Sequence, residues 1–187
     1  MSDMADFFAL EADRTRARAA VEAAVAGDDS AWSELFLAHY PQLSRFFRSR
    51  LPSADEAEDL AAEVFAEAWR SRDRLRWRNR PFSAWLFGIA RRRLASYYRH
   101  RPPQEPLDLT GVPDGLSAPA DDEQLALEIR DILERLPPEH RTALKLRYVV
   151  GLSGLEAAAA MGRSHGAYRA ILHRALRAFL KEFQEQE

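Results

Sequence analysis

The sequence has no cysteine among its 187 residues. Disulfide bonds and cysteine-ligated zinc or iron–sulfur sites are therefore excluded, and a reducing compartment suits the composition. No uncharged apolar run approaches the roughly 18 residues that a membrane-spanning helix needs. The opening residues are acidic and carry no basic segment followed by an apolar core. We therefore expect no secretory signal and no membrane insertion, and we expect the protein to stay in the cytoplasm.

Signatures of catalysis are also scarce. The histidines are scattered, and His100, His140, His165 and His173 show no spacing of the H-E-x-x-H kind that would hold a metal. There is no glycine-rich phosphate loop, and the Ser and Asp residues fall mostly where helix caps are expected. We therefore expect no enzyme activity, no cofactor and no metal site.

The sequence predicts helices almost throughout. Its 8 glycines and 10 prolines fall mainly between segments of helical apolar spacing, and no segment alternates with period two. The first half is expected to hold four helices: about 13–26, ending at Gly27; from about Ser30, bent or divided by Pro41; from Ser53, with Glu56 completing a capping box; and from Pro81 to about 99.

Residues 101–122 differ in kind from the rest. They are rich in Pro, Gly and Asp and show no helical period. A structureless stretch of this length is unusual inside one compact domain. The sequence thus predicts an all-α protein of two small helical domains, 1–100 and 122–187, joined by a flexible acidic linker at 101–121.

The second half ends in a predicted helix-turn-helix over 153–177. After helices that end near Leu136 and Val149, a capping box of Ser153 and Glu156 opens a short alanine-rich helix. A turn at Gly162 follows, and a long helix then runs to about 183. In such a motif the second helix enters the major groove of DNA. Two helices joined by a glycine turn also occur in proteins that bind no DNA.

A basic and aromatic stretch spans residues 69–101, where aromatic rings alternate with arginines. Arginines follow a phosphate backbone and rings stack on unpaired bases, so the stretch favours single-stranded nucleic acid. The alternative is that rings such as Trp85 and Phe87 belong to the core. Upstream, Asp59 and Glu63 lie one turn apart on a predicted helix whose acidic face suits a basic partner protein.

Taken in order, these stretches resemble the extracytoplasmic-function sigma factors of RNA polymerase. The resemblance is carried by AEDLAAEVFAEAWR, by RPFSAWLFGIARRRLASYYRHR, and by LPPEHRTALKLRYVVGLS with the helix-turn-helix after it. It covers roughly residues 20–183 apart from the linker. A stand-alone helix-turn-helix repressor or a helical adaptor remains the alternative, but a repressor would leave the arginine-rich stretch and the acidic helix unexplained.

The resemblance implies a role for each segment. It implies partners in core RNA polymerase, in promoter DNA as duplex and as melted strand, and in an anti-sigma factor. It implies a polymerase-binding surface of Glu58, Asp59, Leu60, Glu63 and Phe65. The implied contacts to the −10 element are Arg76, Trp77, Asn79, Arg80, Phe82, Trp85 and Arg92. The implied contacts to the −35 element are Ser164, His165, Tyr168, Arg169, His173 and Arg174.

Overall fold

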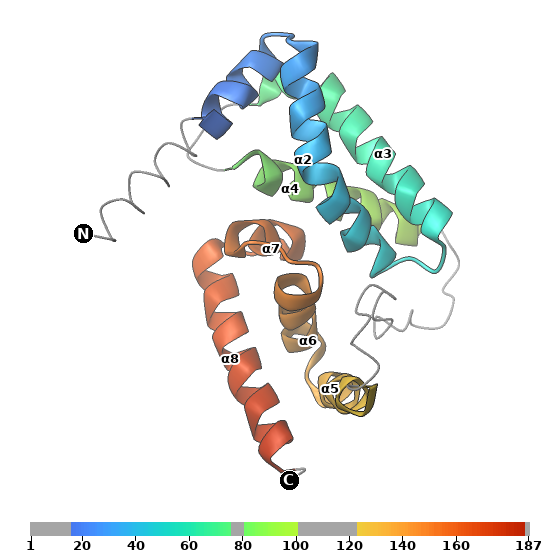
Figure 1. The fold of residues 1–187 in the computed structure, drawn as a ribbon, viewed down its shortest axis with the longest axis vertical. Coiled ribbons are helices and arrows are strands. Elements are labelled where there is room, and N and C mark those ends of the chain that lie inside the picture. The colour runs from blue at the N-terminus through green and yellow to red at the C-terminus, as the bar shows by residue number, and fades with distance from the viewer. Residues whose placement is uncertain (1–15, 76–80, 101–122, 186–187) are drawn as a thin grey trace, which may run out of the picture.

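A computed structural model describes residues 16–75, 81–100 and 123–185 of the chain (Figure 1). Apart from a helix over 16–25, its elements are α2 (Asp29–Arg48), α3 (Ala54–Arg70), the short 3-10 turn η1 (Arg72–Arg74), α4 (Phe82–Arg99), α5 (Glu123–Arg135), α6 (Pro138–Leu144), the π-helical turn η3 (Lys145–Val149) that continues α6, α7 (Gly154–Met161) and α8 (His165–Gln184). No strand occurs in the described residues, which confirms the all-α prediction.

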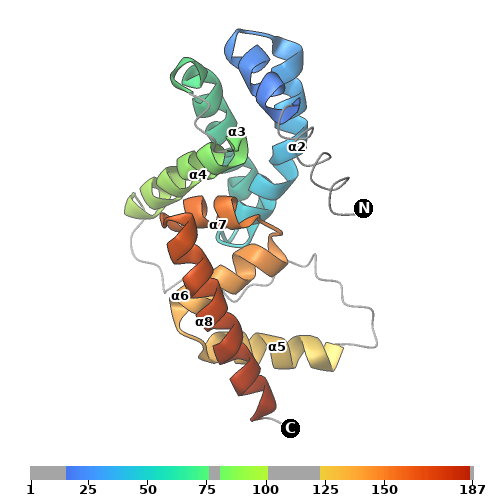
Figure 2. The same ribbon diagram turned by 90° about the vertical axis from the view of Figure 1, so that its left-hand side faces the viewer.

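The helices form two groups, which we call the first and second halves (Figures 1 and 2). The first half holds the helix over 16–25 with α2, α3 and α4, and the second holds α5 to α8. The expected linker lies outside the described residues. Pro41 does not divide the second helix of the chain, because α2 runs through it as one element.

Helix caps show which local predictions hold. The capping box at the start of α7 is confirmed, since the Ser153 side chain accepts from the Glu156 amide and the Glu156 carboxylate accepts from the Ser153 amide. The box expected at the start of α3 is incomplete. Ser53 stands at the N-cap without a side-chain capping bond, while Glu56 accepts a 2.8 Å hydrogen bond from Tyr97 on α4. Glu56, which the local pattern predicts to cap α3, thus also makes a contact between α3 and α4.

A single hydrophobic cluster runs through both halves. It includes Phe47 and Leu86 from the first half and Leu146 and Leu152 from the second, all of them fully buried. A smaller cluster holds α5 against α6 and α8. The two halves therefore share a core in this structure, and the place where they meet is called the seam below.

The seam is formed chiefly by α4 and α7, which lie against one another in both views (Figures 1 and 2). The run Ala157–Ala160 gives α7 a thin side-chain layer, so that it can contact α4 on one side and α8 on another. At its end, Gly162 adopts φ 67°, a left-handed conformation that suits glycine. The Arg91 guanidinium of α4 lies 3.1 Å from where a Cβ on Gly162 would stand.

Candidate nucleic-acid interface

The helix-turn-helix is formed by α7 and α8, as the sequence predicts. Ser164 caps α8 by accepting a hydrogen bond from the Ala167 amide at 3.2 Å. His165, the next residue, rests on the start of α7, where a Cβ on Gly154 would lie 2.9 Å from its Nε2. Gly154 thus leaves room for the His165 ring against the start of α7.

One face of α8 is exposed and basic. Arg169, His173, Arg174 and Arg177 are all exposed and recur at helical spacing along the same side of the helix. Arginine side chains so placed can reach guanine edges or phosphates once the helix lies in a major groove. The structure therefore brings five of the six residues expected at the −35 element, Ser164 included, to an accessible surface.

Tyr168 differs from that expectation because its side chain is fully buried. Its hydroxyl donates a 3.2 Å hydrogen bond to the carbonyl of Ala143 on α6, and burial raises its pKa. The position faces inward since it lies one residue from Arg169, about 100° around the helix. Tyr168 thus joins α8 to α6 and presents no surface to DNA in this structure.

The first half presents a different arrangement of its expected DNA contacts. Arg76, Trp77, Asn79 and Arg80 lie outside the described residues. Phe82 is buried, and Trp85 is half-buried 5.7 Å from the Phe82 ring. Phe82 also meets Trp32 of α2 edge to face at 5.9 Å. These two aromatic residues pack the start of α4 against the core. For Trp85 this agrees with the alternative interpretation, in which the ring belongs to the core.

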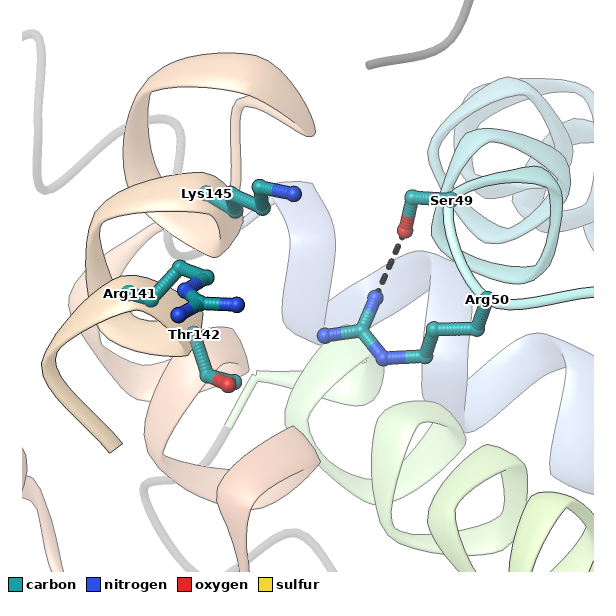
Figure 3. Close-up of a pocket in the computed structure, with 5 residues that line it drawn as sticks. All are labelled: Ser49, Arg50, Arg141, Thr142 and Lys145. Atoms are coloured by element: carbon teal, nitrogen blue, oxygen red, sulfur yellow. Dashed lines mark hydrogen bonds between the residues drawn. The ribbon is translucent and has the colours of Figure 1, made fainter. Parts of the chain in front are cut away.

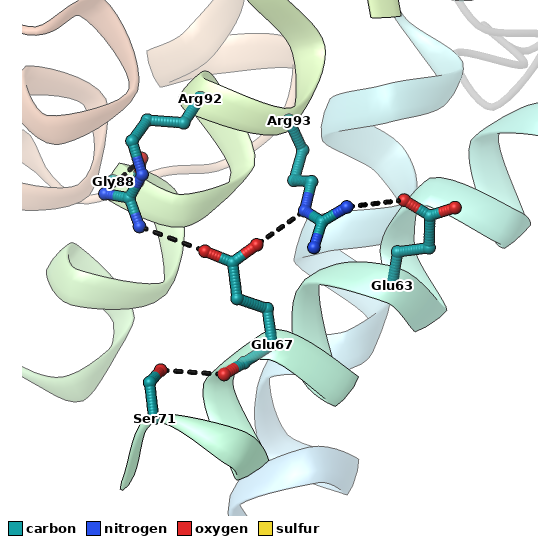
Figure 4. A network of polar contacts seen from close by, with 6 residues as sticks. All are labelled: Glu63, Glu67, Ser71, Gly88, Arg92 and Arg93. Carbon is teal, nitrogen blue, oxygen red and sulfur yellow. Dashed lines mark hydrogen bonds and ion pairs between the residues drawn. The ribbon is translucent and has the colours of Figure 1, made fainter. Parts of the chain in front are cut away.

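Arg92 belongs to an ion-pair network between α3 and α4 (Figure 4). Glu67 of α3 accepts from Arg92 at 3.2 Å and from Arg93 at 2.5 Å, and Arg93 also reaches Glu63 at 3.1 Å. Burial alone would raise the pKa of Glu67, but the bonds from Arg93 and Arg92 outweigh it and lower that pKa. The network therefore fixes the direction of the exposed Arg92 side chain through a residue that sequence analysis did not single out. The feature of the sequence that could have indicated Glu67 is its spacing of four residues from Glu63, which places both carboxylates on one face of α3.

We expect Glu67→Gln to lower the free energy of unfolding by about 1 kcal/mol at pH 7, because a half-exposed ion pair loses its charge. The folded-state pKa of Glu67 is depressed, so its contribution is present above the pKa of the unfolded chain and is lost as the pH falls. The difference between variant and wild type should therefore narrow toward pH ~4. Urea unfolding at several pH values measures it, with Glu34→Gln on the exposed face of α2 as the control. A difference that does not depend on pH would contradict the assignment.

The acidic face of α3 is split between core and surface. Leu60 and Phe65 are buried in the shared core, where they pack α3 against its neighbours. Asp59 and Glu63 are exposed, as is Glu58, which pairs with Arg48 of α2. No ion pair joins Asp59 to another described residue. Of the five residues expected to bind polymerase, the three carboxylates form the accessible set.

In the part of the chain that the structure describes, no group of three or more His, Cys, Asp or Glu side chains is arranged to hold a metal ion. None of the described helices combines the length and the apolar character needed to cross a membrane.

Comparisons with known proteins match both halves. A family model described as Sigma-70 region 2 matches residues 35–102, and one described as Sigma-70, region 4 matches residues 126–179. The chain is 38% identical over 171 residues to the ECF RNA polymerase sigma factor SigD of Mycobacterium tuberculosis, covering 86% of this chain and 81% of that protein. It is 31% identical over 175 residues to the ECF RNA polymerase sigma factor SigF of Caulobacter vibrioides, covering 92% and 97%.

Two solved structures share the fold. One is CnrH in complex with the cytosolic domain of CnrY, with TM-score 0.60 and 26% identity over 91% of this chain and 99% of that one. The other is the sigma factor RpoE in complex with the anti-sigma factor NepR from Bartonella quintana. It has TM-score 0.53 and 26% identity over 81% of this chain and 96% of that one.

Proposed function

The chain belongs to the extracytoplasmic-function sigma factors of RNA polymerase, and from this premise we propose how its surfaces share the work of promoter-specific transcription initiation. The observation that carries the proposal is the order of the two matched regions, region 2 on the first half and region 4 on the second half, which includes the helix-turn-helix. The protein directs polymerase to promoters. Residues 1–100 contact core polymerase and the −10 element, and residues 122–187 contact the −35 element.

For the −35 element, the exposed face of α8 supplies the contacts: Ser164, His165, Arg169, His173 and Arg174. For the −10 element, Arg92 is held at the surface of α4 by Glu67, and the basic segment containing Trp77 and Arg80 supplies rings and charges for an unpaired strand. The protein acts in the cytoplasm and without catalysis of its own, since RNA synthesis belongs to the polymerase.

An anti-sigma factor is the proposed regulatory partner. The two solved structures reported above are each a complex with a second protein, in one case named an anti-sigma factor. The chain has no cysteine, so any redox sensing has to reside in the partner.

In vitro transcription with core polymerase and a library of genomic promoter fragments tests the function directly. We expect transcripts that begin downstream of a common pair of −35 and −10 elements, and only when the protein is added. Equal transcription with and without the protein would count against the function. Promoter-directed transcription supported by residues 122–187 alone would count against the assignment of separate roles to residues 1–100 and 122–187.

Core polymerase binding is proposed to depend on Asp59. Asp59→Lys should weaken binding on the order of tenfold, about 1.4 kcal/mol, because it reverses an exposed charge that no described ion pair engages. Fluorescence anisotropy of the labelled protein titrated with core polymerase measures the affinity. Glu34→Lys makes the same charge change on the exposed face of α2 and should leave it unaltered. Equal losses in both variants would mean that net charge, and not this face, governs association.

A further inference from the structure

The candidate contacts to the two promoter elements lie close together in this structure. Arg92 of α4 follows Arg91, whose guanidinium lies 3.1 Å from where a Cβ on Gly162 would stand. Gly162 ends α7, and residues 162 to 169 lead from it to Arg169 on α8. A chain of that length spans at most about 25 Å even when fully extended. Arg92 and Arg169 are therefore a short distance apart while α4 and α7 are in contact (Figure 2).

Promoter DNA requires a much larger separation. By their positions, the −35 and −10 elements lie about 25 base pairs apart, which is about 85 Å of duplex at roughly 3.4 Å per base pair. A duplex this short resists tight bending, because the persistence length of DNA is about 150 base pairs. A chain whose halves are joined at the seam thus reaches one element at a time. Binding both elements at once requires the two halves to separate.

Apolar packing holds the seam closed. Phe87 of α4 and Leu152 just before α7 are fully buried, and both belong to the cluster that runs through the two halves. Arg91 adds a cation at the C-terminal end of α7, where the helix dipole is negative. Burial lowers the pKa of His39 on α2, and the Glu156 carboxylate of α7 opposes that shift. Because the charge of Glu156 acts on His39, α2 also lies close to α7.

Two arginines at the edge of the seam bond within their own halves. A cavity of about 10 Å³, with room for a single water molecule, lies there between the halves (Figure 3), and it is lined by Ser49, Arg50, Arg141, Thr142 and Lys145. The Arg50 guanidinium donates to the Ser49 hydroxyl at 2.7 Å and to the Phe46 carbonyl at 3.2 Å, all in the first half. Arg141 donates to the carbonyls of Leu133 and Leu136 in the second half. Separation of the halves therefore leaves these hydrogen bonds intact.

We propose that the closed seam is a self-inhibited state of the protein, in which the contact between α4 and α7 prevents simultaneous binding of the −10 and −35 elements. The inference rests on the proposed function, because the two elements set the separation that the chain must reach. Only the open molecules bind both elements, so the apparent dissociation constant equals the intrinsic constant divided by the open fraction. Asp59 and Glu63 on α3 are exposed in the closed state, so core polymerase can bind before the seam opens.

A reversible crosslink tests the proposal in the full chain. Arg91→Cys and Arg163→Cys place one thiol on each side of the seam, at exposed positions, in a sequence that has no cysteine of its own. A short bis-maleimide linker with an internal disulfide joins the thiols and is cleaved by reductant. With core polymerase, the linked protein should give about tenfold less transcript from a promoter with both elements than the same protein after cleavage. Equal amounts of transcript before and after cleavage would overturn the proposal.

The control for this experiment carries the same linker within one half. Glu139 and Arg163 form an ion pair at 2.8 Å inside the second half, so a linker between Glu139→Cys and Arg163→Cys leaves the seam free to open. This protein should transcribe equally before and after cleavage. The wild-type protein separates the inference from the function on which it rests. An inactive wild type would contradict the proposed function itself, whereas an active protein that the linker across the seam does not inhibit would contradict self-inhibition alone.

Energy transfer measures the opening without a crosslink. Glu34→Cys on α2 and Lys181→Cys on α8, both exposed, accept a donor and an acceptor dye. Energy transfer should be high in the free protein and should fall when core polymerase and a promoter are added. Arg91→Glu places a negative charge against the negative end of α7 and should lower the transfer in the free protein, whereas Arg130→Glu on the exposed face of α5 should preserve it. Transfer that polymerase and promoter leave unchanged would refute the opening, even if the crosslinked variants fail to fold.

Discussion

Tyr168→Ala should lower the free energy of unfolding by about 3–5 kcal/mol, the usual cost of removing a large buried aromatic side chain. Tyr168 is fully enclosed in the core and binds the Ala143 carbonyl through its hydroxyl. Truncation leaves a cavity between α6 and α8 and a buried carbonyl without its donor, and both effects act in the same direction. Because the second half is small, we expect its helices to lose their fixed arrangement at ambient temperature.

Chemical unfolding followed by circular dichroism measures the change, and two companion variants separate its causes. Tyr168→Phe keeps the ring and removes the hydroxyl, so its cost should be about 0.5–1.5 kcal/mol. Arg169→Ala alters the next residue, whose side chain is exposed, and should change stability by no more than about 0.5 kcal/mol. If Tyr168→Ala were as mild as Arg169→Ala, α8 would have to be rotated relative to the structure described here.

The second large effect is expected at the −35 element. Arg169 stands in the first turns of α8, the part of a recognition helix that enters the major groove, whereas Arg174 stands more than a turn further along. Arg169→Ala should cost on the order of 1–3 kcal/mol in promoter binding and relax the preference at one base pair. Arg174→Ala should weaken all sequences alike and reduce the salt slope by about one unit, because it removes one phosphate contact.

Binding to a set of promoter variants at several salt concentrations distinguishes the two arginines. Arg130→Ala on α5, exposed and away from α8, is the matched control and should alter neither quantity. If Arg169→Ala changed neither affinity nor base preference, recognition of the −35 bases would have to be assigned to His165 or His173. Identical behaviour of Arg169→Ala and Arg174→Ala would mean that both contact phosphate.

Local signals in the sequence were sufficient for most helices of the described residues. The box of Ser153 and Glu156, the cap at Ser164 and the stop at Gly162 all act within a few residues, and each stands where it was predicted. Ser53 and Glu56 show the same pattern with a different outcome. Ser53 makes no side-chain capping bond, and the Glu56 carboxylate accepts a hydrogen bond from the hydroxyl of Tyr97, which lies far away in the sequence. The incomplete capping box reflects a residue that is close in space and distant in the chain, and a single sequence does not reveal such neighbours.

The sequence predicted which segments form the candidate site, but it predicted less well which residues of those segments are exposed. The two segments that the resemblance singled out are the helices α3 and α8 of the structure, but the resemblance did not say which of their side chains point inward. Tyr168, Phe82, Leu60 and Phe65 all proved to be core residues, because a position within a motif can be filled by a residue that supports the contact without making it. Burial follows from the rotation of each helix on its neighbours, which the spacing of apolar residues fixes only to within one or two positions.

The shared core gives the joining of the two halves a particular dependence on temperature. Separating α7 from α4 would place side chains such as Leu146 and Leu152, now fully buried, closer to water. Exposure of apolar surface increases heat capacity, and the drive to keep that surface out of water weakens on cooling. Molecules in which the two halves have separated should therefore become more numerous on cooling.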